Sequence, residues 1–285
     1  MPHDPRIDLR RTLRPLHGRF LDDGWWLTAR TSDGPATLRI SRRGSDVLGD
    51  AWGEGAETIL NRLPAIVGHH DPADFHTEHP LISELHRRHA GIRFGATGDL
   101  MTPLIGSIVA QKVTWTEAAR AWSGLSRAFS EPAPGPDRGM RLPPDPERMA
   151  TAPYWEFHEL HLEKRRADVI RRVSREASRI QRLADVAAAE AAEWLMRMNG
   201  IGPWTVAGTL EVSNGAPNQV AVGGYHLKNI VVYHLTGRAR GTDEEMMELL
   251  EEFRPNRGRV VRLLLTLGSA PKFGPRSTPR NITRL

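Results

Sequence analysis

The chain has 285 residues, which is enough for one large domain or two modest domains, each with its own core. Hydrophobic residues make up 39% of it and charged residues 26%, as in ordinary globular proteins, and 39 Lys and Arg against 34 Asp and Glu give a net charge of +5. The absence of cysteine excludes disulfides, thiol nucleophiles, zinc ribbons and Cys-ligated iron–sulfur clusters.

The short apolar runs and the lack of a signal-peptide pattern favour a protein of the cytoplasm. The longest apolar runs, such as 263–265, fall far short of the roughly 20 residues that a membrane span needs, and no signal-peptide pattern precedes the first charged residues. A mildly basic, arginine-rich chain is compatible with a nucleic-acid partner but does not establish one. We therefore expect a cytoplasmic protein without a membrane partner.

Residues 1–75 have the pattern of a small α+β domain. Residues 25–31 and 36–40 favour β-strands, and the Ser-Asp-Gly-Pro turn between them predicts a hairpin. A helix is predicted over 55–67, where apolar residues recur on one face. The first domain is thus expected to combine an antiparallel sheet with helices.

Residues 76–285 are expected to form a second, mainly α domain. Its Pro-rich segment 130–146 predicts a loop that interrupts the helices, and its end, 272–285, reads as an extended basic tail. Helices are predicted at 80–89, 99–113, 116–129, 165–180, 184–196, 203–212, 225–235, 243–252 and 257–267.

A tight turn at about 196–206 is the most informative stretch of the second domain. Gly200 and Gly202 leave the backbone bare for close approach, and Pro203 suits the first position of the helix that follows. Amide groups at such a helix N-terminus point outward and favour an anion. A Gly-x-Gly before a helix can also be a turn and nothing more, so the pattern alone leaves both interpretations open.

The wider sequence resembles the helix-hairpin-helix DNA glycosylases. The residues that carry the resemblance are Leu195-x-x-Met198-x-Gly200-Ile201-Gly202-x-x-Thr205-Val206, Val222-Gly223-Gly224-Tyr225-His226-Leu227-Lys228, Pro103-Leu104-Ile105-x-x-Ile108-Val109-x-Gln111-Lys112-Val113, Lys164-Arg165-Arg166-Ala167 and Pro255-x-Arg257. Residues 1–75 are similar to the N-terminal domain of the bacterial 3-methyladenine DNA glycosylase II family. The resemblance implies a helix-hairpin-helix bundle behind an N-terminal α+β domain.

Two features of the sequence place it within that superfamily. Lyases of the superfamily use a lysine two residues after the second hairpin glycine, and Trp204 stands there, so strand cleavage through a Schiff base is not expected. The branches that carry a four-cysteine cluster are excluded by the absence of cysteine. The resemblance therefore implies a bacterial, nucleoid-associated, monofunctional base-excision repair enzyme. It would be a monomer that binds double-stranded DNA and hydrolyses the N-glycosidic bond of a flipped alkylated purine, with no required cofactor.

The resemblance also implies which residues touch the substrate. Trp204 and Tyr225 match positions at the base pocket, where aromatic faces hold a cationic alkylated purine, and Gly208 replaces an aromatic residue of relatives, which predicts a wider pocket. Core packing is the competing interpretation of Trp204. Gln111 and Lys112 match the loop that fills the gap left by the extruded nucleotide, although a lysine would rather reach a phosphate, and the pair can also be an exposed helix end.

The hairpin is implied to bind both phosphate and a cation. Backbone amides of Gly200, Gly202 and Thr205 would hold a DNA phosphate near the lesion. The residues whose main-chain carbonyls would hold a structural Na⁺ or K⁺ are Met196, Met198 and Ile201.

Gly224 stands where the family carries its catalytic aspartate. That carboxylate stabilises the developing oxocarbenium charge, and losing one preorganised electrostatic group typically costs about 10²–10³ in rate. Three explanations compete: an engineered variant, a natural paralogue that binds without cutting, and an acid supplied from elsewhere, for which Glu211 and His226 are weak candidates. The rival functions are a damaged-DNA-binding protein without chemistry and a helical protein whose hairpin contacts other proteins.

Overall fold

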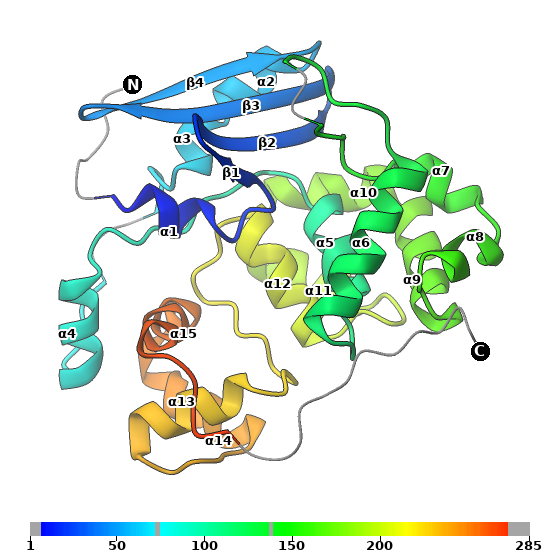
Figure 1. Cartoon of the computed structure of the whole chain (residues 1–285). Helices are drawn as coiled ribbons and strands as arrows, with labels where there is room; N and C mark the ends of the chain where they lie inside the picture. Colours follow the sequence, from blue (N-terminus) through cyan, green and yellow to red (C-terminus); the bar gives the residue numbers. More distant parts are fainter. Residues whose placement is uncertain (1–6, 72–74, 137–138, 273–285) are drawn as a thin grey trace.

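A four-stranded antiparallel sheet forms one side of the molecule, and helices fill the rest (Figure 1). The computed structural model describes residues 7–71, 75–136 and 139–272. The sheet is a meander in the order β1-β2-β3-β4, built from Arg19–Leu21, Gly24–Thr31, Gly34–Arg43 and Asp46–Trp52. The predicted hairpin is confirmed, since β2 pairs with β3 through a tight turn between Thr31 and Gly34. Its two flanking strands, β1 and β4, were not predicted.

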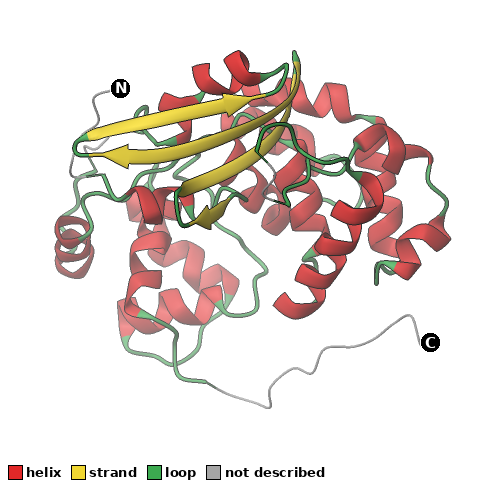
Figure 2. Ribbon diagram, turned by 45° about the horizontal axis from the view of Figure 1, so that its top comes forward, coloured by secondary structure: helices red, strands yellow, loops and turns green. Residues whose placement is uncertain are grey.

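Short helices pack against one face of this sheet, as Figure 2 shows. The helix predicted over 55–67 is two helices, α2 (Ala56–Asn61) and α3 (Leu63–Ile66), which meet at Arg62. Pro64 causes the break, because it has no amide proton for the carbonyl one turn earlier. The first helix of the chain is α1, Leu9–Leu13.

The rest of the described chain is helical, so the prediction of a mainly α fold with an α+β start is confirmed. The α-helices after residue 75 are α4 (Pro80–Arg88), α5 (Met101–Val109), α6 (Trp115–Phe129), α7 (Pro146–Thr151), α8 (Tyr154–Glu159), α9 (Lys164–Arg175), α10 (Ala177–Gln181), α11 (Ala188–Met196), α12 (Pro203–Ser213), α13 (Leu227–Thr236), α14 (Asp243–Leu250) and α15 (Arg257–Leu264). Short 3₁₀ turns follow three of these helices, at Arg182–Asp185, Glu251–Phe253 and Leu265–Leu267. Among the described residues no helix has the length and apolarity to cross a bilayer.

The predicted helices differ from the observed ones mainly at their ends. α5 stops at Val109, four residues before the predicted end, where the buried Arg166 donates from Nη1 to the Val109 carbonyl at 2.7 Å. The helix predicted over 165–180 breaks into α9 and α10 at Glu176. α7 and α8 were not predicted. Residues 273–285 of the predicted basic tail lie outside the described residues.

Buried apolar side chains form three clusters rather than one core. One lies under the sheet, and a second fills the space between α5, α6, α9, α11 and α12. The third joins α4 to α13, α14 and α15, and we call these four helices the distal unit. The two-domain division at residue 75 thus remains a prediction, while the packing groups the described side chains in three.

The Pro-rich segment links the helices to the sheet. Arg30 forms a bidentate ion pair with Glu131, at 2.8 and 2.7 Å, and donates to the Pro143 carbonyl at 2.9 Å. Thr37 donates to the Pro134 carbonyl at 2.7 Å. These bonds hold the two ends of the segment against β2 and β3.

A buried ion pair ties the distal unit to the end of the N-terminal region. Arg259 on α15 lies 2.5 Å from Asp71, and their side chains are only 4% and 2% exposed. The second carboxylate oxygen of Asp71 accepts the Phe94 amide at 2.9 Å, and Arg259 Nε donates to Asn256 at 2.9 Å. Both charges are therefore paired and hydrogen-bonded, which a buried pair requires.

We expect Asp71→Asn to lower the free energy of unfolding by about 3–5 kcal/mol, because it leaves Arg259 buried without its countercharge. Urea denaturation measures the change. Glu84→Gln is the control, since Glu84 pairs with Arg87 and Arg88 at the surface, and its loss should leave the midpoint unchanged. A midpoint for Asp71→Asn equal to that of the control would contradict the assignment.

Candidate DNA-binding and active site

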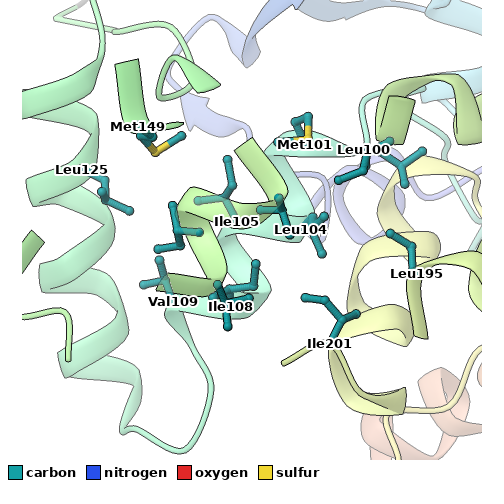
Figure 3. Close-up of a cluster of buried hydrophobic side chains, with 14 of the residues drawn as sticks. Leu100, Met101, Leu104, Ile105, Ile108, Val109, Leu125, Met149, Leu195 and Ile201 are labelled. Atoms are coloured by element: carbon teal, nitrogen blue, oxygen red, sulfur yellow. The ribbon is translucent and has the colours of Figure 1, made fainter. Parts of the chain in front are cut away.

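The turn between α11 and α12 is packed against α9 by its first glycine. Gly200 has φ +91°, and a Cβ added there would lie 2.4 Å from Val169 Cγ2. Any other residue here would be strained at this φ and would force Val169 or the hairpin to shift. Ile201 is buried beside it with Ile108 and Leu195, as Figure 3 shows for their labelled side chains.

The second glycine, Gly202, is not required by the packing or by the backbone conformation. Gly202 has φ −119° and ψ 178°, an extended conformation that any residue adopts, and an added Cβ would meet no atom within 4 Å. Its bare backbone therefore faces open space at the N-terminus of α12. The first backbone bond of that helix runs from Val206 N to Gly202 O at 3.0 Å, so the amides of Trp204 and Thr205 lie in the turn whose N–H groups have no partner within the helix.

Gln111 secures the hairpin instead of standing free. Its Nε2 donates to the Gly200 carbonyl at 3.0 Å and to Thr205 Oγ1 at 2.9 Å. The predicted role of Gln111 in filling a gap in DNA stays a prediction, and in this structure the side chain positions the hairpin. Thr205 itself is buried and its hydroxyl oxygen is engaged by Gln111, and the predicted contact of its backbone amide with a phosphate stays a prediction.

Two basic residues lie beside this turn. Lys112 is exposed and has φ 55°, a left-handed conformation that is rare for a residue with a side chain. Arg172 of α9 donates from Nη1 to the Asn199 carbonyl at 2.6 Å. Arg172 was not predicted, because only the fold brings α9 to the hairpin.

The carbonyls proposed for a cation come from the same turn. The Met198 carbonyl accepts the Ile201 amide at 3.0 Å, which brings two of the three predicted donors within one tight turn. Met196 is the last residue of α11, where helix carbonyls lack partners one turn ahead. The donor chemistry fits a monovalent cation, and the site remains a prediction.

The N-termini of α12 and α13 meet at the predicted reaction point. A Cβ added to Gly224 would lie 3.5 Å from both Cδ1 and Nε1 of Trp204, an ordinary contact, and 3.2 Å from the Ala221 carbonyl oxygen. Gly223 has φ +89° and needs to be glycine, whereas Gly224 does not lie in the left-handed region. The backbone at 224 can therefore carry a side chain directed along the edge of the indole.

The predicted pocket residues lie on either side of this point. Trp204 is half-buried at the start of α12, and Gly208 follows one turn later, where an added Cβ would lie 3.0 Å from Ser107 Oγ of α5. Tyr225 is 65% exposed, with its ring edge-on to His226 at 4.8 Å between centroids. The sequence did not reveal Ser107 as a neighbour of Gly208.

Two carboxylates on the elements that follow the hairpin have structural partners. Glu211, one of the candidate replacement acids, is ion-paired with Arg262 of α15. Asp243, at the start of α14, was missed by the sequence analysis. Its Oδ1 accepts the Gly223 amide at 3.1 Å and its Oδ2 accepts from Lys228 Nζ at 3.1 Å. Asp243 thus fixes the turn that carries Gly224.

Two cavities of the described structure lie elsewhere. One of about 530 Å³ lies between β2, α5 and α6, with His17 and Asp99 in its lining. The other, of about 700 Å³, is bordered by the segment that follows α12. Neither is lined by Trp204 or Gly224, so the candidate site is an accessible junction of two helix ends rather than one of these cavities.

Comparison with known proteins agrees with this architecture. No family model matches the chain. A Bacillus subtilis (strain 168) protein provisionally named DNA-3-methyladenine glycosylase YfjP is 23% identical over 184 residues, which is 63% of this chain and 63% of that relative.

Solved structures match over nearly the whole length. The 3-methyladenine DNA-glycosylase from Archaeoglobus fulgidus superposes with a TM-score of 0.75 at 16% identity, covering 94% of this chain and 97% of that one. The 8-oxoguanine glycosylase/lyase of Clostridium acetobutylicum, solved with double-stranded DNA containing cytosine opposite 8-oxoG, gives a TM-score of 0.72 at 12% identity and covers 92% of each chain. This chain has the fold of the helix-hairpin-helix DNA glycosylase superfamily.

Proposed function

We propose that this chain is built as a monofunctional DNA glycosylase of base-excision repair that binds double-stranded DNA with a damaged base. The observation that carries the proposal is the junction of α12 and α13, where a side chain placed at position 224 would begin within contact distance of the Trp204 indole. The names of the similar proteins support an alkylated purine as the substrate class. We propose a monomer that requires no cofactor, with a Na⁺ or K⁺ held by the hairpin carbonyls.

The chemistry follows from the lesion. An alkylated purine carries positive charge, so the C1′–N bond breaks with its electron pair passing to the base. Water then bonds to C1′ and releases a proton to solvent. The sugar is cationic at the transition state, and a fixed carboxylate beside it would lower the barrier. The indole of Trp204 would hold the cationic base by its π-face.

Gly224 supplies no such charge, and we infer that this form of the protein is impaired. A catalytic acid supplied from another position gains little support, because the carboxylates of Glu211 and Asp243 already have partners. The second candidate function, a damaged-DNA-binding protein without chemistry, is favoured by Gly224 itself. The expected effect on the reaction is the same whether this glycine is natural or engineered.

Gly224→Asp should raise the rate of 3-methyladenine release from methylated DNA by about 10²–10³ in a single-turnover assay. The backbone at 224 is not left-handed, and an added Cβ needs only a shift of a few tenths of an ångström from the Ala221 carbonyl oxygen, so the variant should fold as the parent does. Gly224→Asn is the matched control, because it has nearly the same shape without the charge, and it should show no gain. If the aspartate variant binds damaged DNA but releases no base, the disabled-enzyme hypothesis fails and the binding-only function stands.

Gly202→Ala should weaken DNA binding about tenfold, because the added methyl would keep a phosphate away from the hairpin amides and cost about one hydrogen bond to a charged group. The added methyl meets no protein atom, so thermal stability should not change. Gly200→Ala is the contrasting variant, since its methyl would strike Val169 and should lower stability. The measurement is a mobility shift with abasic and undamaged duplexes at two salt concentrations. Parental affinity in Gly202→Ala would argue against a phosphate at the hairpin and favour protein contacts.

A further inference from the structure

Trp115 leaves more of its surface in water than any other large hydrophobic residue that the structure describes. It is 86% exposed, compared with 65% for Tyr225 and 60% for Trp155. A tryptophan that found a place in a core or interface would bury roughly 150–250 Å². A side chain of this kind, left in solvent by its own fold, is typical of a residue that acquires its contact when a partner binds.

The position of Trp115 is fixed despite this exposure. It is the first residue of α6 and lies inside a capping box, in which Thr114 Oγ1 accepts the Glu117 amide at 3.3 Å and Glu117 accepts the Thr114 amide at 2.8 Å. The backbone that carries the indole is therefore held before any ligand arrives.

The loop that carries Trp115 is anchored to the hairpin. Two bonds from Gln111 join it to Gly200 and Thr205, and Arg166 holds the end of α5 from behind. Lys112 lies three residues before Trp115 and is also exposed. The charged Lys112 and the exposed indole of Trp115 thus lie within four consecutive residues, directly after Gln111, which bonds to the start of α12.

The exposed indole of Trp115 and the charged group of Lys112 suit different parts of a DNA partner. We propose that Trp115 stacks on a base that extrusion of the damaged nucleotide leaves without a neighbour, while Lys112 pairs with a phosphate. The inference rests on the proposed function, because only a site that extrudes a nucleotide creates such a base. An unstacked base presents a π-face of any sequence to an aromatic ring, and large apolar side chains are the residues that enter opened base steps. A lysine is charged and suits the phosphate instead.

The test uses the chain as it stands and needs no base release. Two duplexes are compared, one with a tetrahydrofuran abasic analogue and one undamaged, and the dissociation constant of each is measured for the parent and three variants. Trp115→Ala should weaken binding of the abasic duplex about 5- to 100-fold, the fold-change that corresponds to loss of one base–aromatic stack. It should leave binding of the undamaged duplex and the melting temperature unchanged. Trp115→Phe should keep most of the selectivity.

Trp155→Ala is the matched control, because Trp155 is an exposed tryptophan on α8, which packs on α9 and has no hydrogen bond to the hairpin among the described residues. It should bind both duplexes as the parent does. A 2-aminopurine opposite the abasic site gives a spectroscopic readout, since stacking with an indole quenches it. The quenching should occur with the parent and with Trp155→Ala and be lost with Trp115→Ala.

The outcomes separate the two proposals. If the parent prefers the abasic duplex and Trp115→Ala keeps both the preference and the quenching, this inference is overturned and the proposed function stands. An equal loss in Trp115→Ala and Trp155→Ala would also overturn it. If the parent binds neither duplex, the proposed function and this inference fail together, and a protein partner becomes the better occupant for Trp115.

Discussion

The contact between Gly200 and Val169 is the constraint from which the geometry of the site follows. A backbone at φ +91° lying where a Cβ would be 2.4 Å from a valine methyl seats the hairpin directly on α9. Ile201 is buried at this contact, and α12 begins next to it with the exposed Pro203 and the half-buried Trp204. Trp204 stands in the first turn of α12 and meets the segment before α13. The positions of the amides, of the indole and of the junction with Gly224 thus follow from the close approach of the Gly200 backbone to the Val169 side chain.

The long amphipathic helices could be predicted because their apolar stripes are sustained over several turns, as at α5 and α6. α7 and α8 were missed because each is six residues long and lies among prolines, where no periodic signal develops. β1 was missed because its three residues are mostly exposed and show no alternation.

The residues of the candidate site also fall into those that the sequence could reveal and those that it could not. Local signals revealed Gly200 and Gly202, because turn chemistry acts within a few residues. They did not reveal Asp243, which reaches Gly223 from 20 residues along the chain, or Ser107, which comes from a different helix. Gln111 was identified by resemblance, but its two bonds to the hairpin follow from the packing of α5 on α12 and not from any pattern in the sequence. Partners across elements are a property of the tertiary structure.

At Gly224 the fold of this chain does not depend on the side chain that the proposed chemistry would need. The backbone there needs no glycine, and the neighbouring turn is held by Gly223 and Asp243 whether or not a carboxylate follows. A charged group against the edge of a half-buried indole would be a local cost to stability, of the kind that active sites commonly carry. The absence of a carboxylate at this position can therefore lower the rate of base release without disturbing the fold around it.

The distal unit has a consequence for how the protein is made. Its α4 lies near residue 85 and its α15 near residue 260, and the Asp71–Arg259 pair joins residues 188 apart. During synthesis, the apolar face of α4 with Ile82 and Leu85 emerges long before the helices that cover it. Contacts of such long range also slow folding. The nascent chain must therefore keep α4 soluble while most of the remaining polypeptide is translated, and a truncation before α15 removes the helix that packs most extensively on α4.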